Sequence, residues 1–436
     1  MPQPLAAEIE QTIRDHRLLD IDTAWADEIV FPYYDGLSIR NLAHTVARLL
    51  ITKPPQDGQL GSSPLDPRLW ESHWGEVRRV VLFVSDGLGW LLLNEIMAED
   101  AETAQIVADL MGDGGTLTPI TSIAPSTTAA ALPCIWTGTG PAGTGMVGTK
   151  LFLREFSVLA DMLRYTPVNG RHYREVLADW GLDFDTFLPP PTLAEVLDER
   201  QIPTYLLREK SLFGSGLSRL MHRGVRRATP HYGYNDLWIA LRDLLRQTRR
   251  NRCFVSVYWS AVDGFSHLHG TATEHTITEI RRQLADLRAT LAADKVGDGR
   301  TLFILMADHG HTSVPDHVDL SEHEAIKAAL RCAPGGDSRF AHLYLRHDFR
   351  QPVIDTVRRD LGHQIATLNP ADALAAGLFG PDAPYAETAP RLGDLTLIAR
   401  AGVAMGHGPR HASFPYSMHA GLSDREMLVP LLLRRM

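Results

Sequence analysis

Three stretches of the chain combine a run of apolar, largely β-branched positions with an aspartate close behind it. They are VVLFVSDGLGW (80–90), CFVSVYWSAVDG (253–264) and TLFILMADHGH (301–311). A continuous apolar run without polar alternation is typical of a parallel strand that is buried on both faces of a sheet. The segment LGDLTLIARAG (392–402) has a weaker form of the same pattern, and we expect it to be a fourth strand.

Helical periodicity fills much of the sequence around these runs. Apolar residues recur at helical spacing in YNDLWIALRDLLRQ (234–247) and TITEIRRQLADLRATLAA (276–293), and again near the N-terminus in residues 5–19 and 37–50. Alternation of buried strands with amphipathic helices predicts an α/β fold with a doubly wound, mostly parallel sheet.

The same patterns suggest how the chain divides. Residues 1–75 are expected to form an N-terminal helical extension packed on the core, ending in the connector TKPPQDGQLGSSPLDP. Residues 76–312 and 392–436 are expected to form the core. Between them, residues 313–391 interrupt the pattern of long strands, which predicts a small inserted α/β cap subdomain over the site.

Composition narrows the range of partners. The 436 residues include 43 Lys and Arg against 52 Asp and Glu, a formal net charge of −9, so no nucleic-acid surface is indicated. A small anionic substrate would then need local cations, of which metal ions are the obvious source. Three cysteines without CxxC spacing fit a reducing compartment. With neither a signal-peptide pattern nor an apolar run approaching the ~18 residues of a spanning helix, we expect a cytoplasmic protein without membrane contacts.

Acidic and histidine side chains gather where the predicted strands end. Carboxyl ends of parallel strands meet at one edge of a sheet, so Asp86, Asp263 and Asp308 are expected to lie together. His267 follows Asp263 by four positions and His309 follows Asp308 directly. A single strand-end aspartate is usually a helix cap or turn residue, but three of them with two nearby histidines favour a metal site, because carboxylate and imidazole are ligands of divalent cations. Because Asp308 and His309 are adjacent in the chain, their side chains can reach one metal only from a bent loop, and Gly310 permits such a bend.

The stretch PSTTAAALP (125–133) raises a question of its own. A Ser/Thr cluster before an alanine-rich run is an ordinary helix N-cap, and Ser126 or Thr127 can serve as that cap. A threonine hydroxyl there could also be a nucleophile. Two other kinds of enzyme are excluded by motif: VSDGLGW has Leu92 where a dinucleotide fingerprint needs glycine, and no GxSxG of a serine esterase is present.

Five motifs in order carry a family resemblance. VSDG, PSTTAAALPCIWTG, VDGFSHLHG, ADHGH and MHAG, spread over about residues 78–436, resemble the alkaline phosphatase superfamily. Within it the chain is most similar to the type I phosphodiesterase and nucleotide pyrophosphatase branch. The resemblance implies an alkaline phosphatase-like core and hydrolysis of phosphate esters at a site with two metal ions.

The resemblance also implies roles for individual residues. One metal would be held by Asp86, Thr128, Asp308 and His309, and the other by Asp263, His267 and His419. The family nucleophile stands nine positions before the threonine of a Thr-Gly pair, here Thr137, which selects Thr128 over Thr127. The implied cofactors are two divalent ions, Zn²⁺ first and Mn²⁺ second, and the implied intermediate is a covalent phosphothreonine.

The chain departs from the family pattern near the substrate. Ala131 stands where many members have an asparagine that contacts phosphate, Thr144 where a histidine is usual, and Ala420 where the late motif has glycine. Lys150 and Arg154 are candidates for the missing positive charge, although both equally suit an exposed, solvated segment. Four further histidines near the motifs are expected to lie around the metals or on the protein surface rather than to bind the metals: His269, His311, His407 and His411.

Three hypotheses follow for function. The first is a two-metal phosphodiesterase or nucleotide pyrophosphatase acting on a small phosphate ester, a nucleotide being one candidate. The second is a phosphomonoesterase of the same fold, and the third is a metal-stabilised binding module with little turnover. A sulfatase is disfavoured, because its nucleophile is a Cys or Ser in a Cys/Ser-x-Pro-x-Arg context, whereas alanines follow Thr128.

Overall fold

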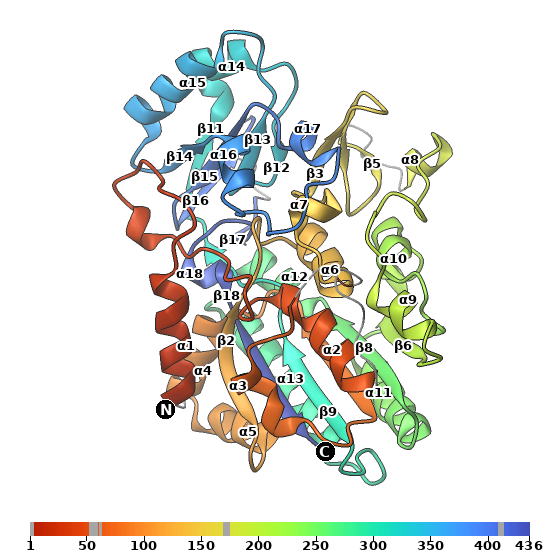
Figure 1. Cartoon of the computed structure of the whole chain (residues 1–436). Helices are drawn as coiled ribbons and strands as arrows, with labels where there is room; N and C mark the ends of the chain where they lie inside the picture. The colour runs from red at the N-terminus through yellow and green to blue at the C-terminus, as the bar shows by residue number, and fades with distance from the viewer. Residues whose placement is uncertain (1–3, 52–59, 61–62, 169–174, 409–413) are drawn as a thin grey trace.

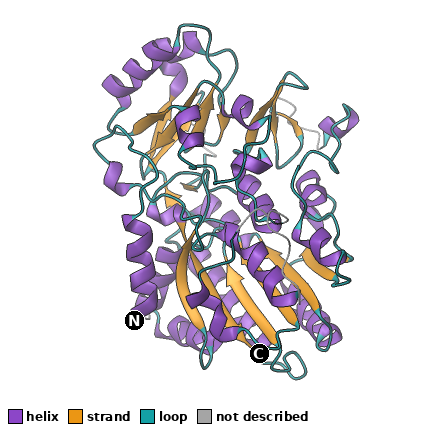
Figure 2. Cartoon of the chain, viewed as in Figure 1, coloured by secondary structure: helices purple, strands orange, loops and turns teal. Residues whose placement is uncertain are grey.

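A computed structural model describes residues 4–51, 60, 63–168, 175–408 and 414–436 of the chain. Two seven-stranded sheets dominate it, the larger in the lower half of Figures 1 and 2 and the smaller in the upper half. The strands of the larger sheet lie in the order β2 (Thr116–Thr121), β18 (Leu428–Arg435), β9 (Thr301–Met306), β1 (Arg79–Ser85), β8 (Cys253–Trp259), β6 (Thr204–Glu209) and β7 (Arg227–His231).

The larger sheet is mostly parallel, as the sequence predicts. β9, β1, β8, β6 and β7 pair in parallel, and β18 runs antiparallel to both β2 and β9. Every residue of β1, β8 and β9 is buried, which explains why their apolar runs do not alternate. The register places Ser85 beside Trp259 and Val84 beside Met306, so three strands end at nearly the same level.

Helices cover both faces of the larger sheet (Figure 2). The first group of mutually packed helices is α4 (Trp90–Glu99), α5 (Ala101–Met111), α11 (Tyr234–Thr248), α12 (Ala261–His269) and α13 (Glu274–Leu291). A second group contains α2 (Leu42–Leu50), α6 (Thr128–Thr137), α9 (Leu193–Asp198) and α10 (Gly216–Met221). The expected helices at 234–247 and 276–293 are therefore confirmed as α11 and α13. No helix among the described residues is long and apolar enough to cross a bilayer.

The smaller sheet combines two separate stretches of chain. Its order is β14 (Ile365–Leu368), β15 (Leu395–Ala399), β13 (Phe340–Leu343), β12 (Gly335–Gly336), β3 (Lys150–Leu153), β4 (Val158–Asp161) and β5 (Thr166–Pro167). Segment 392–402 is a strand, but the expectation that it extends the core is wrong: as β15 it pairs antiparallel with β13 and β14. Four short helices accompany this sheet: α14 (Glu324–Ala329), α15 (Arg350–Thr356), α16 (Pro370–Ala375) and α17 (Thr388–Leu392).

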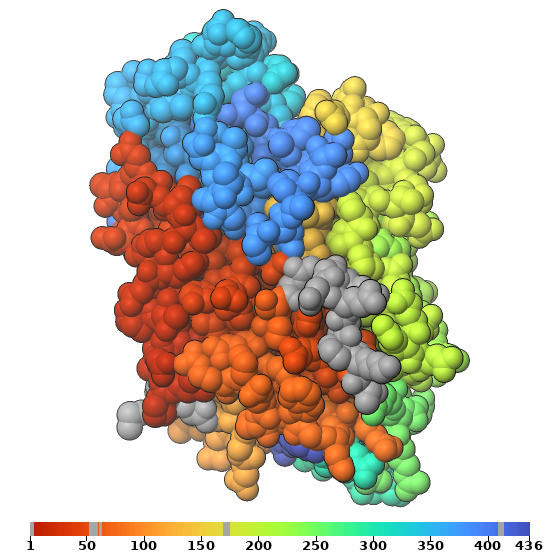
Figure 3. Space-filling view, viewed as in Figure 1, coloured from red at the N-terminus to blue at the C-terminus, as the bar shows by residue number. Residues whose placement is uncertain are grey.

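The N-terminal residues join the two halves. Helix α1 (Pro4–Asp15) packs against β2, and the segment after it reaches the smaller sheet's helices, where Trp25 Nε1 donates to the Gly362 carbonyl at 3.1 Å. Arg400 and Glu28 form an ion pair on the same side, at 2.5 Å. In Figure 3 this N-terminal part, in red, lies against blue residues of the later sequence. Two-stranded ribbons complete the fold: β10 (Thr312–Ser313) with β17 (Ser417–Met418), and β11 (Asp316–Asp319) with β16 (Val403–Gly406).

Candidate active site

Three aspartates meet at the carboxyl edge of the larger sheet. Asp86 follows β1 directly and Asp308 lies two positions after β9. Asp263 lies just beyond β8, because the chain turns after Trp259 into α12, and it occupies that helix's first turn. Its amide donates to the Asp86 carbonyl at 3.0 Å, which ties the start of α12 to the loop after β1. The sequence therefore located the edge correctly, and Asp263 and His267 lie one turn apart on the helix that follows the strand, as their spacing suggests.

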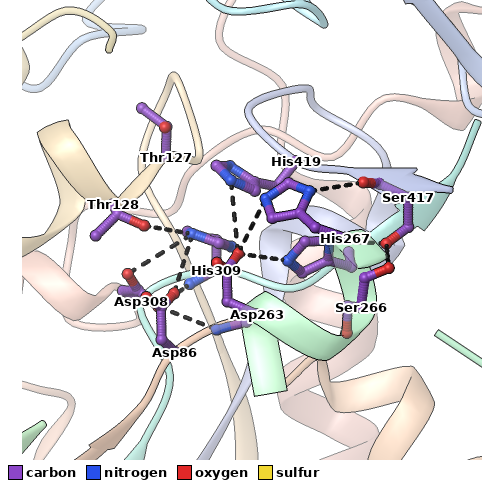
Figure 4. Close-up of polar contacts among 12 residues, drawn as sticks. Asp86, Thr127, Thr128, Asp263, Ser266, His267, Asp308, His309, Ser417 and His419 are labelled. Atoms are coloured by element: carbon purple, nitrogen blue, oxygen red, sulfur yellow. Dashed lines mark hydrogen bonds and ion pairs between the residues drawn. The ribbon is translucent and has the colours of Figure 1, made fainter. Parts of the chain in front are cut away.

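One cluster of side chains surrounds Nε2 of His309. That atom lies 3.0 Å from Thr128 Oγ1, 3.4 Å from Asp86 Oδ1 and 3.7 Å from Asp308 Oδ2. Asp86, Asp308 and His309 are almost fully buried. Figure 4 shows the Thr128 hydroxyl directed at the imidazole, with both carboxylates beneath. The four residues that the resemblance assigned to one metal are thus brought together.

A second cluster surrounds Oδ1 of Asp263. His267 Nε2 lies 3.3 Å from it, His419 Nε2 3.7 Å, and His311 Nε2 2.8 Å. His267 and His419 were expected beside Asp263. His311 was expected only near the metals, yet its Nε2 lies within the same group of potential ligand atoms. Asp263 also joins Asp86 and His309 in a set of potential ligand atoms within 4.8 Å of one another, so the two clusters adjoin.

In each of the three expected histidines, Nδ1 is hydrogen-bonded to a backbone carbonyl. Nδ1 of His267 hydrogen-bonds the Ser417 carbonyl at 2.8 Å, that of His309 the Gly310 carbonyl at 3.1 Å, and that of His419 the Ser126 carbonyl at 3.1 Å. A carbonyl can only accept, so each Nδ1 carries a proton, and in the neutral imidazole each Nε2 presents a lone pair to the clusters. Fixing the imidazole through its other nitrogen is how metal-ligating histidines are held in proteins.

Two carboxylate oxygens in the clusters are available to bind a cation. Asp86 Oδ1 and Asp308 Oδ2 are buried and have no hydrogen-bond partner among the described residues. Such orphaned acceptors are costly in a folded protein. With the inward-facing imidazole nitrogens they form an oxygen and nitrogen donor set suited to Zn²⁺ or Mn²⁺.

The pKa values reflect this crowding. Burial, together with the charges of Asp308 and Asp263, raises the pKa of Asp86 well above its ordinary range. Burial likewise raises the pKa of Asp308 to about 7. Burial acts in the same direction on Asp263, but there the charge and hydrogen bonds of His267 and His311 prevail and hold its pKa well below the ordinary value. Without a cation, two of the three carboxyls therefore retain protons more readily than in water.

The PSTT stretch resolves into three different roles. Thr127 occupies the N-cap position of α6, but its hydroxyl does not cap the helix; it lies 3.1 Å from the hydroxyl of Thr149. Ser126 Oγ instead donates to the Gly421 carbonyl at 2.7 Å. The expectation that one of these hydroxyls caps the helix is wrong. Thr128 begins α6 and alone of the three turns its hydroxyl to the clusters (Figure 4).

The candidate substrate cations lie on the smaller sheet. Lys150 begins β3 and is exposed, while Arg154 follows that strand and pairs with Glu387 at 2.6 Å. No ion pair or hydrogen bond between described residues links either to the clusters. Ala131 is completely buried within α6. His269 stacks on His275 with ring centroids 3.9 Å apart, His407 is exposed after β16, and His411 lies outside the described residues.

One polar contact of the first cluster has no counterpart in the sequence reasoning. The hydroxyl of Tyr258, in β8, donates to Asp86 Oδ2. Beneath it the guanidinium of Arg208 lies 4.9 Å from the centre of the tyrosine ring. A tyrosine inside a fully buried strand was the available signal, because a buried hydroxyl needs a hydrogen-bond partner.

Comparison with known proteins now identifies the family. The family model described as "Type I phosphodiesterase / nucleotide pyrophosphatase" matches residues 80–422. The chain belongs to this family. It is accordingly a phosphoric ester hydrolase, and the recognition made from the five motifs is confirmed. No curated protein matches the chain in sequence.

Solved structures share the fold at low identity. Phosphonoacetate hydrolase from Sinorhizobium meliloti 1021, in complex with phosphonoformate, is 18% identical, with a TM-score of 0.58 over 83% of this chain and 91% of that one. Murine ectonucleotide pyrophosphatase / phosphodiesterase 5 is 13% identical, with a TM-score of 0.59 over 81% and 87%. An inactive variant of the murine protein in complex with AMP aligns over 82% and 88%, with a TM-score of 0.59 and 13% identity. The alkaline phosphatase-like α/β fold expected from the sequence is thereby confirmed.

Proposed function

We propose that this hydrolase cleaves phosphodiester or nucleotide pyrophosphate bonds through a covalent phosphothreonine on Thr128, at a site that binds two divalent metal ions. The observation that carries the proposal is the convergence of the Thr128 hydroxyl with two adjoining Asp/His clusters. Family membership supplies the reaction class. The side-chain arrangement supports the finer mechanism.

The clusters supply two sets of candidate ligands. Asp86, Thr128, Asp308 and His309 would hold one ion, and Asp263, His267 and His419 the other, with His311 against the second set. When bound, such ions would lower the pKa of the Thr128 hydroxyl and stabilise charge on the attacking and leaving oxygens. The imidazole-rich set favours Zn²⁺, with Mn²⁺ as the alternative.

In this proposal Thr128 acts as the nucleophile. Its Oγ would form a bond to phosphorus while the bond from phosphorus to the leaving oxygen breaks, and the hydroxyl proton would be released to water. The N–H groups at the start of α6 would support the phosphoryl group, because a helix N-terminus offers donors and a positive dipole end to an anion. Attack by water on the phosphothreonine would then release the product and restore the hydroxyl.

The neighbourhood of Thr128 favours a substrate of low charge. The asparagine position is taken by the buried Ala131, and Arg154 is already paired with Glu387. A phosphodiester carries one negative charge fewer than a monoester and needs fewer cations from the protein. Structural relatives in complex with AMP and phosphonoformate are consistent with small phosphate-ester or phosphonate ligands.

The decisive experiment compares Thr128→Ala and Thr128→Ser with the wild type. We expect Thr128→Ala to retain bound metal and lose turnover of bis-p-nitrophenyl phosphate by ~10³-fold or more, because the nucleophile is gone. Thr128→Ser should keep measurable turnover, and rapid quenching of the wild type should trap a phosphoryl group on Thr128, detectable by mass spectrometry.

Thr127→Ala is the matched control. It removes a neighbouring threonine hydroxyl that contacts Thr149 rather than the clusters, so turnover should remain within a few-fold of wild type. Equal losses in the Thr127 and Thr128 variants would contradict the nucleophile. A strong preference of the wild type for mono-p-nitrophenyl phosphate would point instead to a phosphomonoesterase. Bound metal without turnover of any phosphate ester would point to a binding module.

A further inference from the structure

A short turn after His419 is bonded to itself through one buried carboxylate. Oε1 of Glu426 accepts from the Gly421 amide at 2.7 Å, and Oε2 accepts from the amide and hydroxyl of Ser423. The Glu426 carbonyl accepts from the Gly310 amide at 2.9 Å, directly after His309. We call residues 421–426 the clamp turn, because it touches several of the loops that carry the clusters.

The clamp turn also reaches the nucleophile loop. Ser126 Oγ donates to the Gly421 carbonyl at 2.7 Å, and the Ser126 carbonyl accepts from the Ala420 amide at 2.8 Å. The same carbonyl accepts from Nδ1 of His419 at 3.1 Å. Ser126 stands two positions before Thr128, so His419 and the candidate nucleophile are held by one set of hydrogen bonds.

The backbone of the clamp turn packs tightly on two more loops. A Cβ at Gly310 would lie 2.1 Å from the Arg425 carbonyl oxygen, and one at Gly89 would lie 3.1 Å from that same oxygen. Gly89 follows Asp86 by three positions and Gly310 follows Asp308 by two. A shift of the clamp turn would therefore be transmitted to both loops, because no side chain or water layer separates the backbones.

Arg339 holds the clamp turn from the smaller sheet. It precedes β13, and its Nε and Nη2 donate to the two carboxylate oxygens of Glu426 at 2.6 and 2.7 Å. Nη1 donates to the carbonyls of Arg400, at 3.0 Å, and Val403, both on the segment after β15. Both charged side chains are 0% exposed. Burial acts to raise the pKa of Glu426, but Arg339 and the donors of the turn keep it below the ordinary value.

We propose that Arg339 is a positioning residue for hydrolysis, acting through Glu426 to fix the relative placement of Thr128, His309 and His419. This inference rests on the proposed function. A planar guanidinium that engages both carboxylate oxygens fixes direction as well as distance, which a lysine ammonium cannot do. Buried ion pairs contribute little net stability compared with apolar replacements of similar volume, so specific placement is the better explanation for this one. The smaller sheet thereby forms part of the frame of the active site.

The test removes the pair without leaving a buried charge. In Arg339→Met/Glu426→Gln both partners become neutral at similar volume. We expect the far-UV circular dichroism to remain that of wild type. Titration calorimetry with Zn²⁺ should show affinity lowered by ~10–100-fold at one site or both, the usual effect of losing an outer partner of metal ligands. The kcat for bis-p-nitrophenyl phosphate should fall by a similar factor with little change in KM, because binding groups are retained while their alignment is lost.

Two further variants make the result specific. Arg331→Met breaks another ion pair of the smaller sheet, with Asp394 at 2.8 Å, but on an exposed surface, and should keep wild-type metal affinity and kcat. Arg339→Lys keeps the positive charge but loses the bidentate contact with Glu426. It should fold and have a kcat between those of the wild type and the double variant. If the double variant does not fold, this variant provides the test.

The outcomes separate this inference from the proposed function. Wild-type Zn²⁺ affinity and kcat in the double variant, or in Arg339→Lys should the double variant be unfolded, would overturn the positioning role and leave the proposed function standing. A fall in melting temperature alone would overturn it equally. A wild-type protein that shows no metal-dependent turnover would overturn the proposed function and the positioning role with it.

Discussion

Thr128 Oγ1 lies 3.0 Å from His309 Nε2, although 181 positions separate the two residues along the chain. The contact joins the first residue of α6 to the loop after β9, two elements that meet at the carboxyl edge of the larger sheet. A hydroxyl in this position shares its surroundings with an imidazole nitrogen that is free of hydrogen. Both groups therefore offer lone pairs to the same small volume, and a divalent cation there would contact both.

Tyr258→Phe should weaken metal binding at the first cluster without unfolding the protein. The variant removes the hydroxyl that donates to Asp86 Oδ2 and leaves the ring against Arg208. Loss of such an outer partner typically costs ~10-fold or more in affinity. Competition of the protein with a fluorescent Zn²⁺ chelator measures the change. Phe83→Leu, in the buried apolar part of the neighbouring strand β1, serves as control: it should lower the melting temperature while affinity is unchanged. Unaltered affinity in Tyr258→Phe would show that Asp86 needs no such donor.

In the metal-free protein, Asp308 should make a contribution to the free energy of unfolding that falls as the pH rises from about 4 to about 7. In this range the folded state retains a proton on Asp308, whose pKa is raised to about 7 by burial, whereas the unfolded chain has released it with an ordinary pKa of ~3.9. At this carboxyl the folded state then binds more protons than the unfolded state, so its contribution to the free energy of unfolding falls with increasing pH. Asp86 acts in the same direction. Asp263, with its lowered pKa, loses its contribution only on acidification below about pH 4.

Buried histidines such as His311, whose pKa burial lowers to about 4, act in the opposite direction, so the contribution of Asp308 is measured as a difference between two proteins. The melting temperature of chelator-treated wild type should fall relative to that of Asp308→Asn as the pH rises across this range. Saturating Zn²⁺ should reverse it, because metal binding requires the deprotonated ligands and strengthens with pH. A difference in melting temperature between the two proteins that stays constant from about pH 4 to about pH 7 would contradict the assignment.

Gly310→Ala should lower both stability and turnover. The added Cβ would meet the Arg425 carbonyl oxygen at 2.1 Å, so the loop bearing Asp308 and His309 would have to move. We expect a destabilisation of ~1–3 kcal/mol, the usual cost of overpacking, together with a fall in kcat. Gly264→Ala is the matched control: it lies in α12 with no atom near its virtual Cβ, so helix propensity should stabilise the protein by up to ~1 kcal/mol. Chemical denaturation and steady-state rates decide; equal stability of the two variants would refute the close-packing argument.

His311→Ala should lower metal affinity at the second cluster, since Nε2 of this histidine contacts Asp263 Oδ1 at 2.8 Å. Either as a ligand or as a partner that orients Asp263, the imidazole supports the cation, and its loss should cost ~10-fold or more. His269→Ala, which removes a ring stacked on His275 away from the clusters, should bind metal as wild type does. Metal titrations of the two variants side by side give the answer, and identical affinities would exclude His311 from the site.

A feature of the site could be predicted from the sequence when it depends on neighbouring residues in the chain, and not when it depends on tertiary contacts. Asp86 and Asp308 follow buried strands whose apolar runs are unmistakable, so the edge where they meet was predictable from sequence. The direction of Thr128 was not: its distinction from Thr127 came from the spacing to Thr137 in the family pattern, because neighbouring residues at a helix start have the same propensities. Tyr258 was missed because nothing in a strand sequence shows which hydroxyl meets which carboxylate.

The wrong assignment of segment 392–402 to the core has a similar cause. The apolar run of β15 has the length and composition of a core strand, and a five-residue run carries no information about which sheet it joins. Pairing partners far along the chain, β13 and β14, decided that. The bond between Arg339 and Glu426 likewise spans 87 positions and depends on that tertiary arrangement.

The smaller sheet takes β3–β5 from residues 150–167 and its remaining strands from residues 335–399. Both stretches must be present before the sheet can close, and the first of them follows α6 and Thr128 within the chain. Exchange of the smaller sheet among relatives, in evolution or in the laboratory, therefore cannot be made by replacing one contiguous segment of the chain. A chimera that replaced only residues 335–399 would have to pair its new strand at the position of β12 with the original β3. Whether it folds would depend on that one strand pairing.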